Sequence, residues 1–353
     1  MNPSPIPTRR KIARLAVAFA AAYAPVAALG ADRIRLEGGE SISGRIVDES
    51  AQAVSIEDID GRVRKAPVER IRSVLFDGEP ASLAQARLNA EAGGYETALE
   101  KLADIDVSTI SDERIRDEIA FLKAYSAARL AEAGQGAEAE AVKPLLEFVR
   151  DNPASWRTAD ALTALGDLLA SAGRYDQAVQ AYGRLARDGS SEIKRRAAVL
   201  AAEALAGKGD HDRAIELFDR VAQSDDAADP LARRALAGKA QALAAAGEPE
   251  AALELGRRLV RNAQPADAAA RAAGYNTLGR VYEATDRTTD AVLAYLHTDL
   301  LFADDPDTHA EALARLAELF GKIGKPDAAD DARERLRRGY ASTRWARRAV
   351  RPN

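Results

Sequence analysis

A small residue recurs along the second half of the chain at a nearly constant spacing. Successive members of the series are 36, 38, 39 and 38 residues apart, and apolar residues between them recur at i, i+3, i+4 and i+7. A repeat of this length holds one pair of helices, which buries its apolar face only by stacking on the next pair. The series therefore predicts a mainly α array of stacked helix pairs over residues 81–340. Its members are Ala178, Ala214, Ala252, Ala291 and Ala329.

Glycines mark the predicted turn inside each helix pair, because a glycine just past a helix end can adopt the left-handed conformation. They are Gly173, Gly209, Gly247 and Gly324. Longer connections between pairs are predicted at Asp229-Pro230 and Asp305-Pro306, where a capping aspartate precedes a proline suited to the first helical position. An earlier copy around Gly93-Gly94-Tyr95 brings the array to about seven helix pairs.

The stretch Tyr275-Asn-Thr-Leu-Gly279-Arg-Val-Tyr282 has a tyrosine three residues after its glycine. Further along the chain, Ala291 is followed four residues later by Tyr295. Together they resemble a tetratricopeptide repeat, and residues 155–340 carry weaker copies of the same pattern. The resemblance implies a right-handed α-solenoid in which small residues let helices approach and aromatic residues fill the space towards the next unit. The residues expected to do so are Gly166, Ala178, Tyr182, Ala214, Phe218, Ala252, Gly279, Tyr282, Ala291, Tyr295 and Ala329.

The end of the array carries a second resemblance. Tyr340-Ala-Ser-Thr-Arg-Trp345-Ala346 is similar to a run found in bacterial envelope repeat proteins of the BamD type and of the periplasmic Tol-Pal-associated type. Ala341 stands where that run usually has proline, and the chain has no cysteine for lipid attachment. The resemblance implies a role in protein–protein interaction in the cell envelope.

Residues 31–78 change period. Apolar residues such as Ile34, Leu36, Ile42 and Ile46 alternate with polar ones, as in half-buried strands. About five short strands separated by glycine turns are predicted. The segment resembles an SH3-like or Sm-like β-barrel module, and we expect it to serve as a structural or protein-docking unit ahead of the repeats.

The first thirty residues are organised as a secretory signal peptide. A basic segment around Arg9 and Arg14 precedes an almost wholly apolar run from Leu15 to Leu29, and Ala28-Leu29-Gly30 provides small residues for cleavage. A retained membrane anchor is the alternative, although the run is short for a spanning helix and Pro25 interrupts it. We therefore predict a periplasmic protein that begins near Ala31, exported by either the general secretory or the twin-arginine route.

Residues for metal binding or catalysis are scarce. The chain has no cysteine and three histidines, His211, His297 and His309, without metal-ligand spacing. A net charge of -5 gives no overall field that would attract nucleic acid. We therefore expect no enzyme activity, no cofactor, no metal site and no nucleic-acid partner.

Two surfaces remain as candidates for contact with a partner. The first helix of each pair lines the inner face of such an array, where Thr163, Asp167 and a mixed-charge set would lie; this set comprises Arg196, Glu203, Arg234, Gln241, Asn276, Arg280 and Glu283. Arg234, Asn276 and Arg280 would offer planar donors to an extended acidic or polar segment. The second surface is the basic tail, residues 341–353, which is either a solvated end or a contact for an anionic surface.

These features favour an exported, non-enzymatic scaffold that binds envelope proteins through its repeats. The alternative is a protein associated with peptidoglycan or another carbohydrate, in which residues 31–78 bind the polymer and the repeats act as a spacer. The sequence leaves the identity of the partner and the oligomeric state open.

Overall fold

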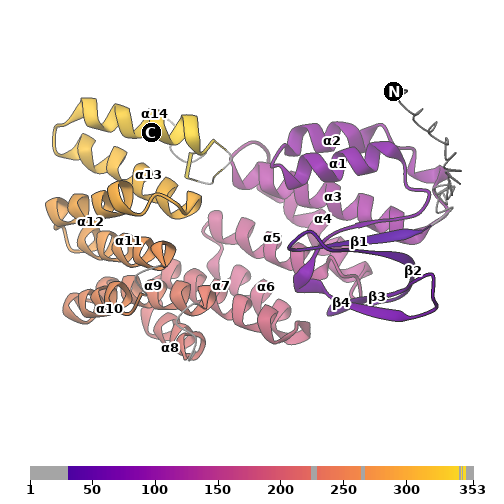
Figure 1. The fold of residues 1–353 in the computed structure, drawn as a ribbon, viewed down its shortest axis with the longest axis horizontal. Coiled ribbons are helices and arrows are strands. Elements are labelled where there is room, and N and C mark those ends of the chain that lie inside the picture. Colours follow the sequence, from indigo (N-terminus) through magenta and orange to yellow (C-terminus); the bar gives the residue numbers. More distant parts are fainter. Residues whose placement is uncertain (1–30, 224–228, 264–266, 342, 344, 347–353) are drawn as a thin grey trace, which may run out of the picture.

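The computed structural model describes residues 31–223, 229–263, 267–341, 343, 345 and 346. The predicted signal segment, residues 1–30, and most of the basic tail lie outside the described residues. Starting at Asp32, a small β unit is followed by a long helical array, as Figure 1 shows. The prediction of a mainly α repeat array preceded by a small β unit is confirmed.

The β unit is a five-stranded antiparallel sheet with the order β4-β3-β2-β1-β5. Its strands are β1 Asp32–Leu36, β2 Ser41–Glu49, β3 Ala53–Glu57, β4 Val63–Pro67 and β5 Ile71–Leu75, with a 3₁₀ turn at Val68–Arg70 before the last. The long β2 pairs with β1 along its first half and with β3 along its second. Gly44 lies between the halves, where a Cβ atom would fall 2.0 Å from the Glu57 carbonyl oxygen. A side chain at residue 44 would therefore force β2 and β3 apart.

The described residues contain fourteen α-helices, and each consecutive pair packs together (Figure 1). They are α1 Ala81–Glu91, α2 Tyr95–Ala103, α3 Glu113–Glu132, α4 Glu138–Asp151, α5 Thr158–Ser171, α6 Tyr175–Asp188, α7 Ser191–Lys208, α8 His211–Ala222, α9 Pro230–Ala245, α10 Pro249–Asn262, α11 Ala268–Ala284, α12 Thr288–Leu301, α13 Pro306–Lys322 and α14 Pro326–Gly339. A 3₁₀ turn, Val107–Thr109, lies between α2 and α3.

The caps and turns have the geometry that the sequence suggested. Asp229 accepts hydrogen bonds from the backbone N–H groups of Leu231 and Ala232, and Asp305 accepts one from Thr308. The four predicted turn glycines have φ between 72° and 90°. In the turn between α11 and α12 this conformation is held by Asp286, with φ of 56°, which is rare for a residue other than glycine.

The series alanines are all buried, and Gly166 and Gly279 of the first helices lie in close contact with the second helix of their own pair. A Cβ atom on Gly166 would lie 2.3 Å from the Tyr182 ring, and one on Gly279 would lie 2.6 Å from the Tyr295 ring. These two aromatic rings therefore lie against the first helix of their own pair, and each also belongs to a hydrophobic cluster that includes buried residues of the next first helix. The Phe218 ring does reach the next pair, where it lies against Gly238 of α9.

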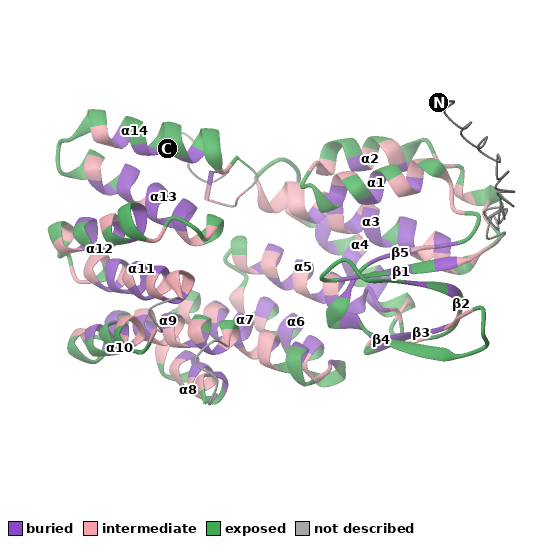
Figure 2. Ribbon diagram, in the orientation of Figure 1, coloured by how far each residue is buried: buried purple, intermediate pink, exposed green. Residues whose placement is uncertain are grey.

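The β unit is attached along the edge where second helices end and first helices begin. Asp32 accepts hydrogen bonds from the backbone of Ile46 and Asp77 and from Arg114 Nη1 of α3 at 2.9 Å. Glu49 Oε1 accepts from the backbone N–H of Trp156, just before α5, at 3.0 Å. These hydrogen bonds join residues that are far apart in sequence, so they fix the β unit against the first helix pairs. The buried apolar residues of the β unit and of these helices form one hydrophobic cluster, and buried segments are seen in both parts in Figure 2.

Candidate partner-binding surface

The first helices of the repeats form one continuous surface. α5, α7, α9, α11 and α13 each contact the next in this series, while the second helices lie on the outer side (Figure 1). Side chains that point away from the second helices therefore line a common inner face. Every candidate site residue that the sequence suggested lies on these five helices.

The most accessible pair on this face joins α7 to α9. Arg234 donates from Nε to Glu203 Oε1 at 2.7 Å and from Nη2 to Glu203 Oε2 at 2.6 Å, so both planar groups are fully engaged. The two side chains are 42% and 39% exposed. Burial opposes the charge of Arg234, but Glu203 outweighs that effect and raises the pKa of the guanidinium. An incoming carboxylate could replace Glu203 without unfolding the array.

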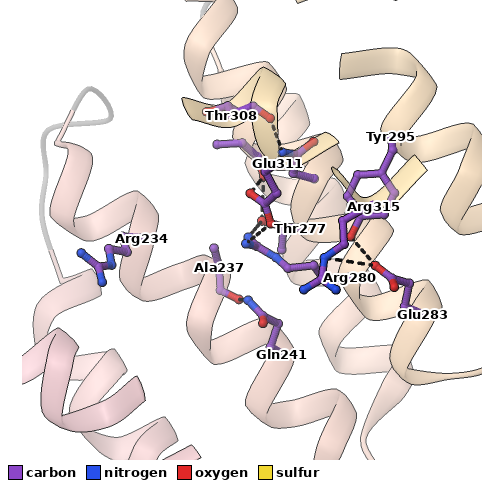
Figure 3. Close-up of polar contacts among 12 residues, drawn as sticks. Arg234, Ala237, Gln241, Thr277, Arg280, Glu283, Tyr295, Thr308, Glu311 and Arg315 are labelled. Atoms are coloured by element: carbon purple, nitrogen blue, oxygen red, sulfur yellow. Dashed lines mark hydrogen bonds and ion pairs between the residues drawn. The ribbon is translucent and has the colours of Figure 1, made fainter. Parts of the chain in front are cut away.

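The next cluster, between α11 and α13, is a structural cross-link, as Figure 3 shows. Asn276 is fully buried, and its Nδ2 donates to the Thr308 carbonyl oxygen at 2.9 Å and to Glu311 Oε2 at 3.2 Å. Arg280 Nη1 donates to Glu311 Oε1 at 2.7 Å. The prediction that Asn276 faces an open groove is therefore wrong, because Glu311 and Thr308 of the neighbouring helix cover its side chain. Arg280 is likewise engaged within the protein.

Glu283 completes this region of the inner face. Its Oε1 accepts a hydrogen bond of 2.6 Å from the Tyr295 hydroxyl and lies 3.9 Å from Arg315 Nε (Figure 3). Sequence reasoning missed Arg315 and Glu311, because their role depends on which side chains of the previous helix they meet. The guanidinium of Arg315 also lies 5.8 Å from the centre of the Trp345 ring. The segment after α14 thus reaches the end of the inner face.

The remaining candidates lie in the middle and at the start of this surface. Gln241 Nε2 donates to the Ala237 carbonyl oxygen at 3.3 Å and remains partly exposed. Asp167 accepts from the Tyr182 hydroxyl at 2.8 Å and from Arg129 at 3.1 Å. Thr163 donates to a carbonyl of its own helix. Arg196 of α7 is partly exposed, and within the described part of the chain its buried Nε has no hydrogen-bond partner.

One histidine lies in a buried polar network that the sequence did not reveal. His309 Nε2 lies 2.7 Å from Asp299 Oδ1, and its Nδ1 lies 2.6 Å from the Tyr340 hydroxyl. Arg335 also donates to Asp299, so the network joins α12, α13, α14 and the segment after α14. Among the residues that the structure describes, no group of three or more acidic, histidine or cysteine side chains is placed to hold a metal ion.

Two further features complete the survey of the described residues. An apolar hollow of about 640 Å³ lies between α2, α3 and α4 and is lined by side chains such as Leu99, Ala124 and Phe148. None of the helices described here is long and apolar enough to cross a membrane.

Comparison with known proteins agrees with this architecture. The tetratricopeptide repeat family matches residues 163–228 and 200–268. These ranges end before the Tyr275–Tyr295 unit. A search of curated proteins gives no match.

The similarity to one solved structure supports the fold. A tetratricopeptide repeat protein from Parabacteroides merdae is 12% identical, with a TM-score of 0.51 over 76% of this chain and 98% of that one. The apo form of the quorum sensor NprR from B. thuringiensis is 14% identical, with a TM-score of 0.48 over 72% and 74%. A repeat-containing protein from Cytophaga hutchinsonii is 15% identical, with a TM-score of 0.42 over 76% and 100%. The family match identifies tetratricopeptide repeats within residues 163–268, and the other helix pairs of the array stack in the same way.

Proposed function

We propose that this chain is an exported, non-enzymatic adaptor that binds an extended segment of another envelope protein along its inner face. The observation that carries the proposal is the Arg234–Glu203 pair, which joins α9 to α7 on the inner face and remains partly exposed. Ordered helices hold these side chains in place, so a partner can bind without paying for folding of the site. A polar segment with both charge signs suits the face, because α5 carries only acidic residues, α9 carries only basic residues, and α7, α11 and α13 carry both.

The sequence before the β unit supports export. Residues 1–30 have the basic and apolar order of a signal peptide, and β1 begins at Asp32, one residue after the predicted new N-terminus. Asp32 is buried and anchored, so the folded unit starts directly behind the predicted cleavage site. N-terminal sequencing of protein recovered from the periplasm should begin within a residue or two of Ala31. An intact Met1 end would contradict export with cleavage.

Site-specific crosslinking tests the binding face. A photoreactive residue placed at Gln241 should capture a partner protein in intact cells, because Gln241 is partly exposed in the middle of the inner face. The matched control is Arg220, an exposed residue on the outer side of α8. Crosslinks at Arg220 but none at Gln241 would refute the inner-face site. Crosslinks to cell-wall polymer from Arg35 of the β unit would instead favour the carbohydrate-associated alternative.

Arg234→Ala provides an independent check on the same site. It should weaken capture at Gln241, because the partner loses a fork of two donors, while far-ultraviolet circular dichroism stays unchanged. Arg220→Ala, which removes an exposed arginine from the outer side, should leave capture as it is in the wild type.

A further inference from the structure

Two repeat positions meet where neighbouring first helices pack together on the inner face. One lies eighteen residues before a series alanine, and the other lies eleven residues before the preceding series alanine. Between α7 and α9 these positions hold Arg234 and Glu203, which approach to 2.6 Å. Between α11 and α13 they hold Glu311 and Arg280, which approach to 2.7 Å (Figure 3). The same two positions therefore form an ion pair at both interfaces, with the charges exchanged.

Between α5 and α7 the two positions hold Asp167 and Arg196, which have suitable charges. Asp167 is already occupied on both oxygens, because Oδ1 accepts from the Tyr182 hydroxyl at 2.8 Å and Oδ2 accepts from Arg129 Nη1 at 3.1 Å. Within the described residues Arg196 forms neither a hydrogen bond nor an ion pair. The repeat thus places an arginine here without the carboxylate that pairs with its charged equivalents.

The environment of Arg196 makes this vacancy costly. The side chain is partly exposed and its Nε is shielded from solvent, so water solvates the guanidinium only in part. A partly desolvated charge without a partner is unfavourable, and an anion that binds it offsets that cost. Three other arginines of the inner face each have a carboxylate of this chain within 4 Å: Arg234, Arg280 and Arg315. Arg196 therefore offers donors that no described residue occupies.

The neighbours of Arg196 restrict where an anion can lie. On the α5 side, the carboxylate of Asp167 would repel it. On the α9 side, Arg234 holds the same repeat position as Arg196, so an anion between the two helices is attracted by a second guanidinium. A carboxylate suits this place, because its two oxygens match the planar donor fork of an arginine.

We propose that Arg196 binds the side-chain carboxylate of an aspartate or glutamate in the partner segment. The inference rests on the proposed function, because it requires a segment that lies along the inner face. Beyond α9 the segment passes Gln241, whose equivalent position on α11 is Ala273, so no charged or amide side chain from that position covers it. The acidic residue is the anchor, and it binds without displacing any described residue of this chain.

The geometry of the array gives the length of segment between the two points. First helices in contact lie about 8–10 Å apart, and Arg196 and Gln241 differ by seven positions along the helix, which is about 10 Å. The resulting separation of roughly 14 Å corresponds to about four residues of extended chain. A segment captured at residue 241 should therefore have its acidic anchor about four residues away.

Photo-crosslinking in intact cells tests the anchor, with a photoreactive residue in place of Gln241 in the full chain. Arg196→Ala should reduce capture about tenfold or more. Arg196→Lys keeps the charge but loses the planar fork, so it should reduce capture less. Arg220→Ala, on the outer side of α8, is the matched control and should leave capture unchanged. Circular dichroism should be the same for all variants, because Arg196 forms no bond with the described residues.

Mass spectrometry of the crosslinked peptide tests the spacing. An aspartate or glutamate about four residues from the crosslinked position is expected, and a segment without an acidic residue there overturns the proposal. Capture that survives Arg196→Ala also overturns it, while the proposed function stands. If residue 241 captures no segment, the proposed function fails and the anchor fails with it.

Acetate serves as a defined probe for the purified full chain. In heteronuclear NMR of the isotopically labelled protein, the Nε–H signal of Arg196, assigned by its loss in Arg196→Ala, should shift and saturate as acetate is added. The signal of Arg280, which Glu311 already holds, should shift much less. An Arg196 signal that does not respond, or arginine signals that all respond equally, overturns the proposal. Saturation at lower concentration by inorganic phosphate than by acetate overturns it too, because the site would then select a phosphate group.

Discussion

Arginine–glutamate contacts occur in two regions of this molecule, but in opposite surroundings. Near the β unit, Glu118 lies between Arg87 and Arg157, at 3.1 Å and 2.8 Å, and its side chain is 1% exposed. Arg87 is also paired with Glu79 in the link that follows β5. On the inner face, Glu203 makes the same kind of contact with Arg234 while 39% exposed. The buried cluster fixes how the β unit and three helix pairs meet, whereas the exposed pair joins two neighbouring first helices within reach of solvent.

The electrostatics of the buried cluster follow from its neighbours. Burial alone would raise the pKa of Glu118, but the guanidiniums of Arg157 and Arg87 outweigh that effect and hold the pKa below its usual value. Arg157 is further enclosed by aromatic rings, with its guanidinium 3.8 Å from the Trp156 ring centre and 4.5 Å from that of Phe121. Removing the charge of Glu118, Arg87 or Arg157 would therefore leave a buried charge without its partner and shielded from water.

The largest effect is expected from Glu118→Gln. A neutral amide cannot compensate two buried guanidiniums, so the free energy of unfolding should fall by about 3–5 kcal/mol. The control, Glu203→Gln, removes the equivalent charge at an exposed pair. Urea unfolding followed by circular dichroism compares the two. Similar losses in both variants would show that burial does not separate the two regions.

A smaller loss is expected from Arg280→Ala, which tests whether the α11–α13 cluster belongs with the buried type. Glu311 is buried and would keep only Asn276 as a partner, so we expect a loss of about 2–3 kcal/mol in unfolding free energy. Arg234→Ala, on the exposed pair, is the matched variant and should stay within about 1 kcal/mol of the wild type. If Arg280→Ala were equally mild, Arg280 would be available to a partner after all.

The carboxylate of Asp117, beside the buried cluster, is expected to destabilise the folded chain. Desolvation, then Glu113 and Glu49, raise the pKa of Asp117 to about 6 from 3.8. The folded chain thus binds this proton more tightly than the unfolded chain, and ionisation weakens the fold as pH rises through that window. Asp117→Asn should therefore stabilise the protein by about 1–2 kcal/mol at neutral pH, a value reduced for partial exposure, with little effect below about pH 4.

Unfolding measured against pH checks the sign of this effect. The Glu118 carboxyl has a lowered pKa, so its contribution is present above its unfolded pKa and is lost as pH falls. The unfolding free energies of Asp117→Asn and Glu118→Gln should therefore differ most at neutral pH, where the first variant is more stable than the wild type and the second is less stable. An Asp117→Asn variant less stable than the wild type at neutral pH would contradict the assignment.

Local rules were enough to predict the elements of this fold. The alanine period, the turn glycines and the alternation in residues 32–76 each depend on a few neighbouring residues, and the structure has helices, turns and strands there. A repeat position also shows which residues face inward. It does not show that Glu311, thirty-five residues further on, covers Asn276. The same holds for Asp32 and Arg114, eighty-two residues apart.

Some of these distant pairs do leave a trace in the sequence. Arg195 and Arg233 each donate to an aspartate 34 residues further along, at Asp229 and Asp267, where the next first helix begins. An arginine and an aspartate that recur at the same positions of successive repeats therefore predict a contact between neighbouring helix pairs. The Glu118 cluster has no such copy, because it forms where the array meets the β unit, and so no period could reveal it.

The smallest effect is expected at the Arg234–Glu203 pair itself. A double-mutant cycle with Arg234→Ala and Glu203→Gln should give a coupling energy of about 0.2–1 kcal/mol, because water screens both groups. Added salt should reduce it further. The same cycle at Arg157 and Glu118 should give several times more and respond little to salt. A weak pair is what a binding face needs, since a partner carboxylate has to displace Glu203 before it can use both donors of Arg234. A coupling as strong as that of the buried pair would mean that Arg234 is committed to the fold, and the inner-face site would have to lie elsewhere.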